Sequence, residues 1–113
     1  MKDIVVLDGV RTAIGTFGGS LAGTSPIELG SIVAKEALAR SGVEGKQVGN
    51  VVFGHVINTE PRDMYLSRAA SIAAGVPEKA PAMNVNRLCG SGLQAIVSAA
   101  QSLMLGDATM ALA

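Results

Sequence analysis

The sequence predicts an α/β fold, with a mixed but mostly parallel β-sheet and helices on both of its faces. Two observations favour this class. Short apolar runs, each long enough for one strand, alternate along the 113 residues with segments whose apolar side chains recur at helical spacing. Strands that alternate with helices are typical of parallel sheets, because each crossover needs a helix to return the chain. In addition, 49% of the residues are hydrophobic and 16% are charged, which is enough apolar material for one domain, or for part of one.

The N-terminal region predicts a strand, a loop and the start of a helix. Residues 4–7 (Ile-Val-Val-Leu) form a continuous apolar run, which is typical of a buried strand. Residues 11–24 carry four glycines and predict a loop. A helix is expected after Ser25, which serves as the N-cap, with Pro26 in the first helical position. Glu28 then completes a capping box.

This helix is expected to end at Gly42, because glycine readily adopts the left-handed conformation of a C-cap. Its predicted apolar face comprises Leu29, Ile32, Val33 and Ala37. Residues 51–53 and 56–57 predict a second strand around Gly54. The segment 58–63 is a mixed polar loop, and we expect its charged side chains to be solvated.

The second half of the chain predicts further strands and helices in alternation. An alanine-rich helix over residues 65–74 precedes a strand over residues 82–85. A last helix follows Cys89, and residues 108–113 form a fourth strand. The predicted apolar face of the last helix comprises Leu93, Ile96, Val97, Ala100 and Leu103. Because the opposite face is small or uncharged as well, we expect this helix to be covered on most sides.

The longest uncharged run, residues 88–106, is long enough to suggest a membrane span. Five Ser and Gln side chains and three glycines interrupt it. We therefore predict a helix inside a globular protein, and no membrane partner.

Charge and cysteine content exclude several classes of function. Nine Lys and Arg residues balance nine Asp and Glu residues, and the basic residues are scattered. A nucleic-acid partner is not expected, because it would need a clustered basic patch. The single cysteine cannot form an internal disulfide, and the N-terminus has no signal-peptide core. These features predict a cytoplasmic protein.

Cys89, the only cysteine, lies between a predicted strand and a predicted helix, in Asn-Arg-Leu-Cys-Gly-Ser-Gly (86–92). A thiolate is a strong nucleophile, and a helix N-terminus favours negative charge. The glycines that follow allow a substrate or another backbone to approach the sulfur. A lone cysteine in this setting is a candidate covalent catalyst. Free cysteine is also a common buried hydrophobe, so the residues alone leave both interpretations open.

Other catalytic arrangements find less support in the sequence. A neighbouring base can activate a thiol, but nothing in the sequence brings His55, the only histidine, near Cys89. We therefore favour a structural or surface role for His55. No metal site is predicted from one cysteine and one histidine. A papain-type protease is excluded, because no aromatic residue follows the Cys-Gly-Ser motif.

One segment resembles the acyl-enzyme signature of the thiolase family. Residues 85–96 read Val-Asn-Arg-Leu-Cys-Gly-Ser-Gly-Leu-Gln-Ala-Ile. Upstream, Gly-Val-Arg-Thr (9–12) and Gly-Thr-Phe-Gly-Gly (15–19) are similar to the N-terminal strand and loop of the family. Arg-Ala-Ala (68–70) and Ala-Gly-Val-Pro (74–77) also fit. The resemblance extends over essentially the whole chain.

The resemblance implies an acyltransferase that makes or cleaves 3-ketoacyl-CoA. Cys89 would attack the thioester of acetyl-CoA or of a 3-ketoacyl-CoA and carry the acyl group as an S-acyl enzyme. Its backbone N–H would contribute to an oxyanion hole, and Leu88 would line the acyl pocket. Coenzyme A thioesters would be substrates, with no tightly bound cofactor and no metal. Full-length members form homodimers or homotetramers.

Departures from the family limit what this chain is expected to do alone. The family supplies an activating histidine and a second cysteine from its C-terminal part, and His55 does not match the motif of that histidine. Residues 60–65 are most like those of broad-specificity bacterial 3-ketothiolases. We expect residues 1–113 to be the N-terminal part of the thiolase N-terminal domain, inactive in isolation, with the remainder of that domain and the C-terminal domain absent. Alternatives are a ketoacyl-ACP synthase-like condensing enzyme and a non-catalytic acyl-CoA-binding protein of thiolase fold.

Overall fold

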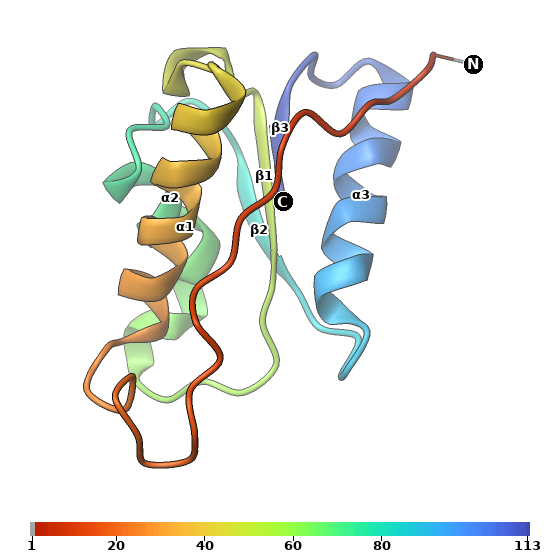
Figure 1. Cartoon of the computed structure of the whole chain (residues 1–113). Coiled ribbons are helices and arrows are strands. Elements are labelled where there is room, and N and C mark those ends of the chain that lie inside the picture. The colour runs from red at the N-terminus through yellow and green to blue at the C-terminus, as the bar shows by residue number, and fades with distance from the viewer. Residues whose placement is uncertain (1) are drawn as a thin grey trace.

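The computed structural model describes residues 2–113, in which helices and parallel strands alternate. In chain order the elements are α1 (Pro26–Ser41), a 3₁₀ turn (Gly45–Gln47), β1 (Asn50–Gly54), a second 3₁₀ turn (Pro61–Tyr65), α2 (Leu66–Ala73), β2 (Ala82–Val85), α3 (Ser91–Leu105) and β3 (Ala111–Leu112). The strands form one parallel sheet in the order β2-β1-β3. Helices α1 and α2 lie on one side of this sheet and α3 lies on the other (Figure 1). The predicted α/β class, with helices on both faces, is confirmed.

The central strand β1 supplies the core of both helical layers. Val51 and Val52 are adjacent, so their side chains point to opposite faces of the sheet, and both are fully buried. Val51 packs with Leu38, Val76 and other residues on the side of α1 and α2. Val52 packs with the small side chains of α3 on the other side. Two consecutive apolar residues are therefore required at this position, as in parallel strands that are covered on both faces.

Helix α1 begins as predicted, but its buried face differs. The Ser25 hydroxyl oxygen accepts the backbone N–H of Glu28 at 3.1 Å, which confirms the N-cap. Among the described residues the Glu28 carboxylate makes no return bond, so the capping box is only half formed. The most buried residues are Ala34 and Leu38, next to the predicted face rather than on it. Leu38 packs with Val51 of β1 and with Val48 and Val76 of the neighbouring loops, and α1 also packs along α2.

Helix α3 faces the sheet with its small residues and not with its large ones. Ser91, Ala95 and Ala99 are buried, whereas Leu93 is 70% exposed. The predicted apolar face was therefore wrong, and so was the expectation of cover on most sides within the described residues. The physical reason is that small side chains let the helix axis approach the sheet closely. By length and composition alone, Leu88–Leu105 would suffice to cross a membrane, and 17% of this window is buried.

Residues 4–7 were predicted to form a buried strand, and that prediction was wrong. The segment is irregular in the structure, and Val5, Val6 and Leu7 are 71%, 81% and 54% exposed. It runs in front of the β3 side of the sheet (Figure 1) without pairing to it. A strand exists through its ladder of hydrogen bonds, and no described strand pairs with residues 4–7.

Two other predicted strands were too long at one end. The pairing of β1 with β2 ends at Gly54 and Val85, so residues 56–57 have no strand partner. Similarly, β3 pairs only with the first two residues of β1, so residues 108–110 precede the ladder. The predicted helix over residues 65–74 is confirmed within one residue at each end.

Candidate active site

Cys89 lies in the short turn that joins the carboxyl end of β2 to the start of α3. In Figure 1 this turn projects beyond the end of the sheet, below α3. The side chain of Cys89 is exposed and is not part of a disulfide. Of the two interpretations that the residues left open, the buried hydrophobe is therefore wrong. An exposed thiol before a long helix is accessible to a reagent or a substrate.

Two neighbouring side chains hold this turn through hydrogen bonds to its backbone. Ser91 Oγ accepts the N–H of Arg87 at 2.8 Å and donates to the carbonyl oxygen of Leu88 at 2.6 Å. Asn86 Oδ1 accepts the N–H of Leu88 at 2.9 Å. Backbone bonds from Gly90 to Arg87 and from Ser91 to Leu88 complete the turn. The polar groups that support Cys89 therefore surround it without using its own side chain.

Within residues 87–91 one backbone N–H has no partner in the described structure, and it belongs to Cys89. The other four donate to Ser91 Oγ, Asn86 Oδ1 or a carbonyl of the turn. An unpaired N–H beside an exposed thiol is a donor that an incoming oxygen atom can use. This geometry suits stabilisation of a negative oxygen at a carbon attacked by the sulfur.

Leu88, the residue before Cys89, has a left-handed backbone conformation with φ of 48°. It is the only described residue other than glycine with a positive φ. For a non-glycine residue this conformation costs on the order of 1–2 kcal/mol, which the surrounding bonds must offset. Its side chain is 68% exposed. Within residues 2–113 the Leu88 side chain is therefore mostly uncovered.

Gly54, at the end of β1, allows the start of α3 to rest directly on the sheet. A Cβ atom at this position would lie 2.6 Å from the carbonyl carbon of Ser91 and 2.7 Å from the nitrogen of Gly92. These are backbone atoms, so they cannot turn aside as a flexible side chain would. Gly54 therefore sets how closely the segment after Cys89 packs against β1.

His55 does not form a catalytic pair with Cys89 in the described structure. Its Nε2 lies 2.7 Å from Asn58 Oδ1, and its backbone N–H donates to Val85. No hydrogen bond or ion pair among residues 2–113 joins His55 to Cys89. The observed contacts agree with the structural or surface role that we predicted. The same residues contain no cluster of three or more His, Cys, Asp and Glu side chains that could hold a metal ion.

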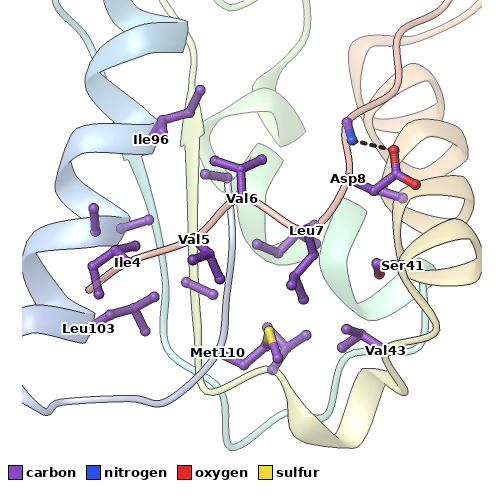
Figure 2. Close-up of a pocket in the computed structure, with 18 of the residues that line it drawn as sticks. Ile4, Val5, Val6, Leu7, Asp8, Ser41, Val43, Ile96, Leu103 and Met110 are labelled. Carbon is purple, nitrogen blue, oxygen red and sulfur yellow. Dashed lines mark hydrogen bonds between the residues drawn. The ribbon is translucent and has the colours of Figure 1, made fainter. Parts of the chain in front are cut away.

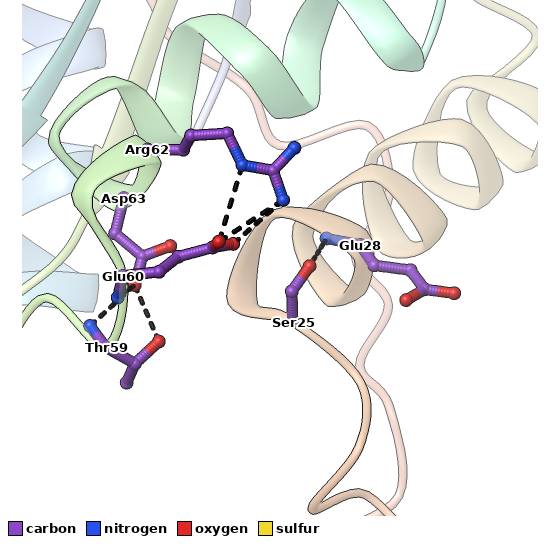
Figure 3. A network of polar contacts seen from close by, with 6 residues as sticks. All are labelled: Ser25, Glu28, Thr59, Glu60, Arg62 and Asp63. Carbon is purple, nitrogen blue, oxygen red and sulfur yellow. Dashed lines mark hydrogen bonds and ion pairs between the residues drawn. The ribbon is translucent and has the colours of Figure 1, made fainter.

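The loop after β1 is organised by Asp63, which we had expected to be solvated and which is instead fully buried. Its Oδ2 accepts the N–H and the hydroxyl of Thr59, both at 2.7 Å, and the N–H of Glu60 at 3.2 Å (Figure 3). The bond from the Thr59 hydroxyl is the main cause that lowers the pKa of Asp63, followed by the Thr59 backbone bond. By contrast, Glu60 and Arg62 form a surface ion pair at 3.1 Å.

Asn84 connects this loop to the strand that leads to Cys89. From β2, its side chain accepts the N–H of Ser67 at 2.9 Å and donates to the carbonyl oxygens of Asp63 and Met64. The turn after β2 and the loop after β1 are therefore neighbours at the same edge of the sheet. This edge, the carboxyl end of parallel strands, is where α/β proteins commonly bind ligands.

An apolar hollow of about 600 Å³ lies away from Cys89. Its walls are the N-terminal segment with Ile4, Val5 and Val6, the inner faces of α1 and α3, and the chain around Met110 (Figure 2). The lining is mostly apolar and includes neither Cys89 nor Leu88. The hollow separates residues 4–7 from the sheet, and it offers no chemical group to the thiol.

Sequence reasoning named Cys89 and Leu88 as candidates and did not name Asn86, Ser91 and Gly54, which hold or border the turn in the structure. A signal was present for the first two, because Asn and Ser are the residue types whose side chains bond to nearby backbone groups in turns. Gly54 had a weaker signal, as an isolated glycine inside an apolar run. Asp63 gave none, since a charged residue beside Glu60 and Arg62 resembles a solvated loop.

The structure is that of an α/β domain with an exposed cysteine at a strand-to-helix turn, at the carboxyl edge of a parallel sheet. The comparisons with known proteins identify the family. A family model described as "Thiolase, N-terminal domain" matches residues 4–113. The chain therefore belongs to the thiolase family.

Individual relatives agree with this assignment. A beta-ketothiolase from Cupriavidus necator is 64% identical over 98% of this chain, and an acetyl-CoA acetyltransferase from the same species is 46% identical over 100% of it. The crystal structure of an Ascaris suum thiolase in complex with coenzyme A matches 95% of the chain, with a TM-score of 0.90 and 31% identity. The predicted thiolase-like fold is confirmed. The chain spans 28% of the length of each of these relatives.

Proposed function

We propose that this chain is the N-terminal part of the N-terminal domain of a longer acyltransferase, one that forms or cleaves 3-ketoacyl-CoA through an acyl group on Cys89. The observation that carries the proposal is the exposed thiol of Cys89 beside its own unpartnered backbone N–H, at the start of α3. The names of the relatives support the substrate class, since they are a beta-ketothiolase and an acetyl-CoA acetyltransferase.

In the first step, the Cys89 thiolate attacks the carbonyl carbon of an acetyl-CoA thioester. A carbon–sulfur bond forms to Cys89, and the carbonyl oxygen becomes an oxyanion that the Cys89 N–H stabilises. Removing one such donor typically costs about 10²- to 10³-fold in rate. Collapse of the intermediate breaks the bond to the coenzyme A sulfur, which leaves as a thiolate and takes up a proton.

In the second step, a coenzyme A compound accepts the acyl group. For synthesis, a base removes a proton from the α-carbon of a second acetyl-CoA, and the resulting enolate attacks the acyl carbon. A carbon–carbon bond forms, Cys89 leaves as a thiolate, and acetoacetyl-CoA is released. For thiolysis, Cys89 attacks the keto carbon of a 3-ketoacyl-CoA, acetyl-CoA leaves, and the thiol of coenzyme A removes the acyl group from Cys89.

The proton-transfer groups of this mechanism are not assigned to residues 2–113. We propose that the longer protein supplies a histidine that activates Cys89 and a second cysteine that acts as acid and base. His55 is not given that role, since it contacts Asn58 and Val85. Leu88 would line the acyl pocket once other polypeptide covers its exposed side chain. Accordingly, the isolated 113-residue chain should have negligible turnover.

The apolar surfaces of the chain support the proposal of a longer protein. The hollow beside residues 4–7 and the outer face of α3 are both apolar and uncovered. A membrane is a poor cover for α3, because Ser and Gln side chains and glycines interrupt the uncharged run over residues 88–106. We propose instead that other parts of the protein cover it, with no membrane and no nucleic-acid partner.

We further propose a cytoplasmic protein that acts as a homodimer or homotetramer and needs no tightly bound cofactor. A catalytic thiol has to remain reduced, and the cytoplasm keeps thiols in that state. Coenzyme A thioesters are then its substrates, and neither a metal nor a prosthetic group takes part in the steps above.

An assay of thiolysis tests this proposal. The longer protein is expected to convert acetoacetyl-CoA and coenzyme A to acetyl-CoA, and the 113-residue chain alone is not. Robust thiolysis by the isolated chain would contradict the proposed division of the active site. A preference for acetyl-ACP over acetyl-CoA as acyl donor would support the ketoacyl-ACP synthase alternative instead. Intact binding of coenzyme A without turnover by the longer protein would indicate a binding protein of thiolase fold.

A further inference from the structure

We propose that Ser91 is a positioning residue for the nucleophile, because its buried hydroxyl fixes the turn that presents Cys89. The inference rests on the proposed function, since the position of Cys89 matters for acyl transfer only if it carries the acyl group. Ser91 is 4% exposed, whereas Cys89, two residues earlier, is exposed. The hydroxyl is therefore withdrawn from the substrate side and acts through the backbone of the turn.

The two hydrogen bonds of this hydroxyl connect Ser91, which follows Cys89, to Arg87 and Leu88, which precede it. One bond receives the N–H of Arg87 at 2.8 Å, on the strand side of Cys89. The other donates to the carbonyl of Leu88 at 2.6 Å. Ser91 is also the first residue of α3, so its backbone position is fixed by the helix. A single side chain thus ties the end of β2 to the start of α3 across the reactive residue.

The conformation that these bonds select is one that Leu88 would not adopt by itself. Its φ of 48° is unfavourable for a side chain that is mostly exposed and therefore not held by packing. The bond from Ser91 holds the Leu88 carbonyl, and Asn86 holds the Leu88 N–H at 2.9 Å. Without the hydroxyl, Leu88 can relax toward negative φ. That rotation would move both the sulfur and the N–H of Cys89.

Gly54 fixes the other side of the arrangement. The backbone of Ser91 rests against β1 so closely that a Cβ at Gly54 would lie 2.6 Å from it. The helix start therefore cannot shift to compensate for a changed turn. After loss of the hydroxyl, the backbone of residues 87–90 has to move instead, and this segment includes Cys89.

The test compares three variants of the longer protein. Ser91→Ala removes the hydroxyl, and Ser91→Thr retains it. Ser102→Ala is the matched control, because it removes a hydroxyl from the same helix that bonds to Asn50 at 2.7 Å and to Ala99 at 2.9 Å, far from the turn. The readouts are the single-turnover rate of Cys89 acetylation by acetyl-CoA, followed by mass spectrometry, and the KM for acetyl-CoA in steady state.

Ser91→Ala is expected to slow acetylation by about 10- to 100-fold, as misplacement of a reacting group by about 1 Å does, with a KM within about threefold of wild type. Ser102→Ala should acetylate at the wild-type rate, and Ser91→Thr should recover to within about fivefold of it. Acetylation of Ser91→Ala within twofold of wild type would overturn the inference, as would an equal loss in Ser102→Ala. If wild-type protein forms no acetyl adduct on Cys89, the proposed function itself fails.

Discussion

The loop after β1 and the turn after β2 lie side by side at one edge of the sheet, and they use buried polar groups in opposite ways. In the first, Asp63 is itself the buried group, and it gathers the backbone of Thr59 and Glu60 around its carboxylate. In the second, the buried hydroxyl of Ser91 supports a different residue, the exposed Cys89. The first arrangement uses one buried carboxylate oxygen, Oδ2, to bind the loop and leaves Oδ1 buried without a partner, whereas the second leaves a thiol and an N–H free at the surface. The turn after β2 holds an exposed thiol in a fixed position, and this makes it the better candidate for a reactive site.

Replacing Cys89 is expected to give the largest effect on activity and almost none on stability. Cys89→Ala removes the acyl acceptor, so acetyl transfer by the longer protein should fall by at least about 10³-fold. Because the side chain is exposed, the free energy of unfolding should change by less than about 0.5 kcal/mol. Initial rates and urea denaturation measure the two quantities. A large loss of unfolding free energy in Cys89→Ala would show that Cys89 has a structural role, as Asp63 has.

Gly54→Ala is expected to disturb the turn after β2, because Gly54 lies against the start of α3. The new Cβ meets the backbone of Ser91, so α3 must move, at a cost of about 1–3 kcal/mol in unfolding free energy. Acetylation of Cys89 should slow by about 10- to 100-fold because the turn moves with the helix. Gly23→Ala is the control, since a Cβ there meets nothing within 4 Å. Equal unfolding free energies and equal acetylation rates for the two variants would show that Gly54 does not position Cys89.

Asp63→Asn tests whether the buried carboxylate in the loop after β1 stabilises the fold. The lowered pKa of Asp63 means that its carboxylate stabilises the folded state at neutral pH, and that this contribution is lost as the pH falls through the folded-state value. The variant should be less stable than wild type at pH 7, and its stability should depend less on pH between about 5 and 2. Urea midpoints across this range provide the measurement. Parallel curves for the two proteins would mean that Asp63 is not the titrating group.

Ser25→Ala should have the smallest effect of the series. It removes the N-cap bond of α1, which lies on the opposite side of the sheet from α3, and should cost about 1 kcal/mol of stability. The rate of Cys89 acetylation should stay within twofold of wild type. A larger change in that rate would mean that the nucleophile is coupled to α1, contrary to the separation of the two layers.

The sequence predicted the elements whose signals are local. Ser25, Pro26 and Gly42 bound α1 as expected, and the central strand at Val51 and Val52 is buried on both faces. It failed for residues 4–7, since an apolar run becomes a strand only when a neighbouring strand lies beside it. The face of α3 also depends on which side chains allow the closest approach to the sheet, and this is a property of packing rather than of periodicity.

For the candidate site, the motif around Cys89 indicated which thiol to propose as the nucleophile, but it did not indicate the side chains that hold its turn. The bonds of Ser91 and the contact of Gly54 span two strands and a helix, so they appear only when the chain is folded. Asp63 was predicted to be solvated because its neighbours Glu60 and Arg62 are charged and the segment is a polar loop. Its burial follows from hydrogen bonds to Thr59, which three-residue charge patterns do not encode.

The most direct test of the central claim is to incubate the longer protein with acetyl-CoA, quench it with acid and map the acetyl group by peptide mass spectrometry. We expect one acetyl adduct, on the peptide that contains Cys89, which disappears when coenzyme A is added before the quench. An unmodified Cys89, or an acetyl group on another residue that turns over with coenzyme A, would contradict the claim.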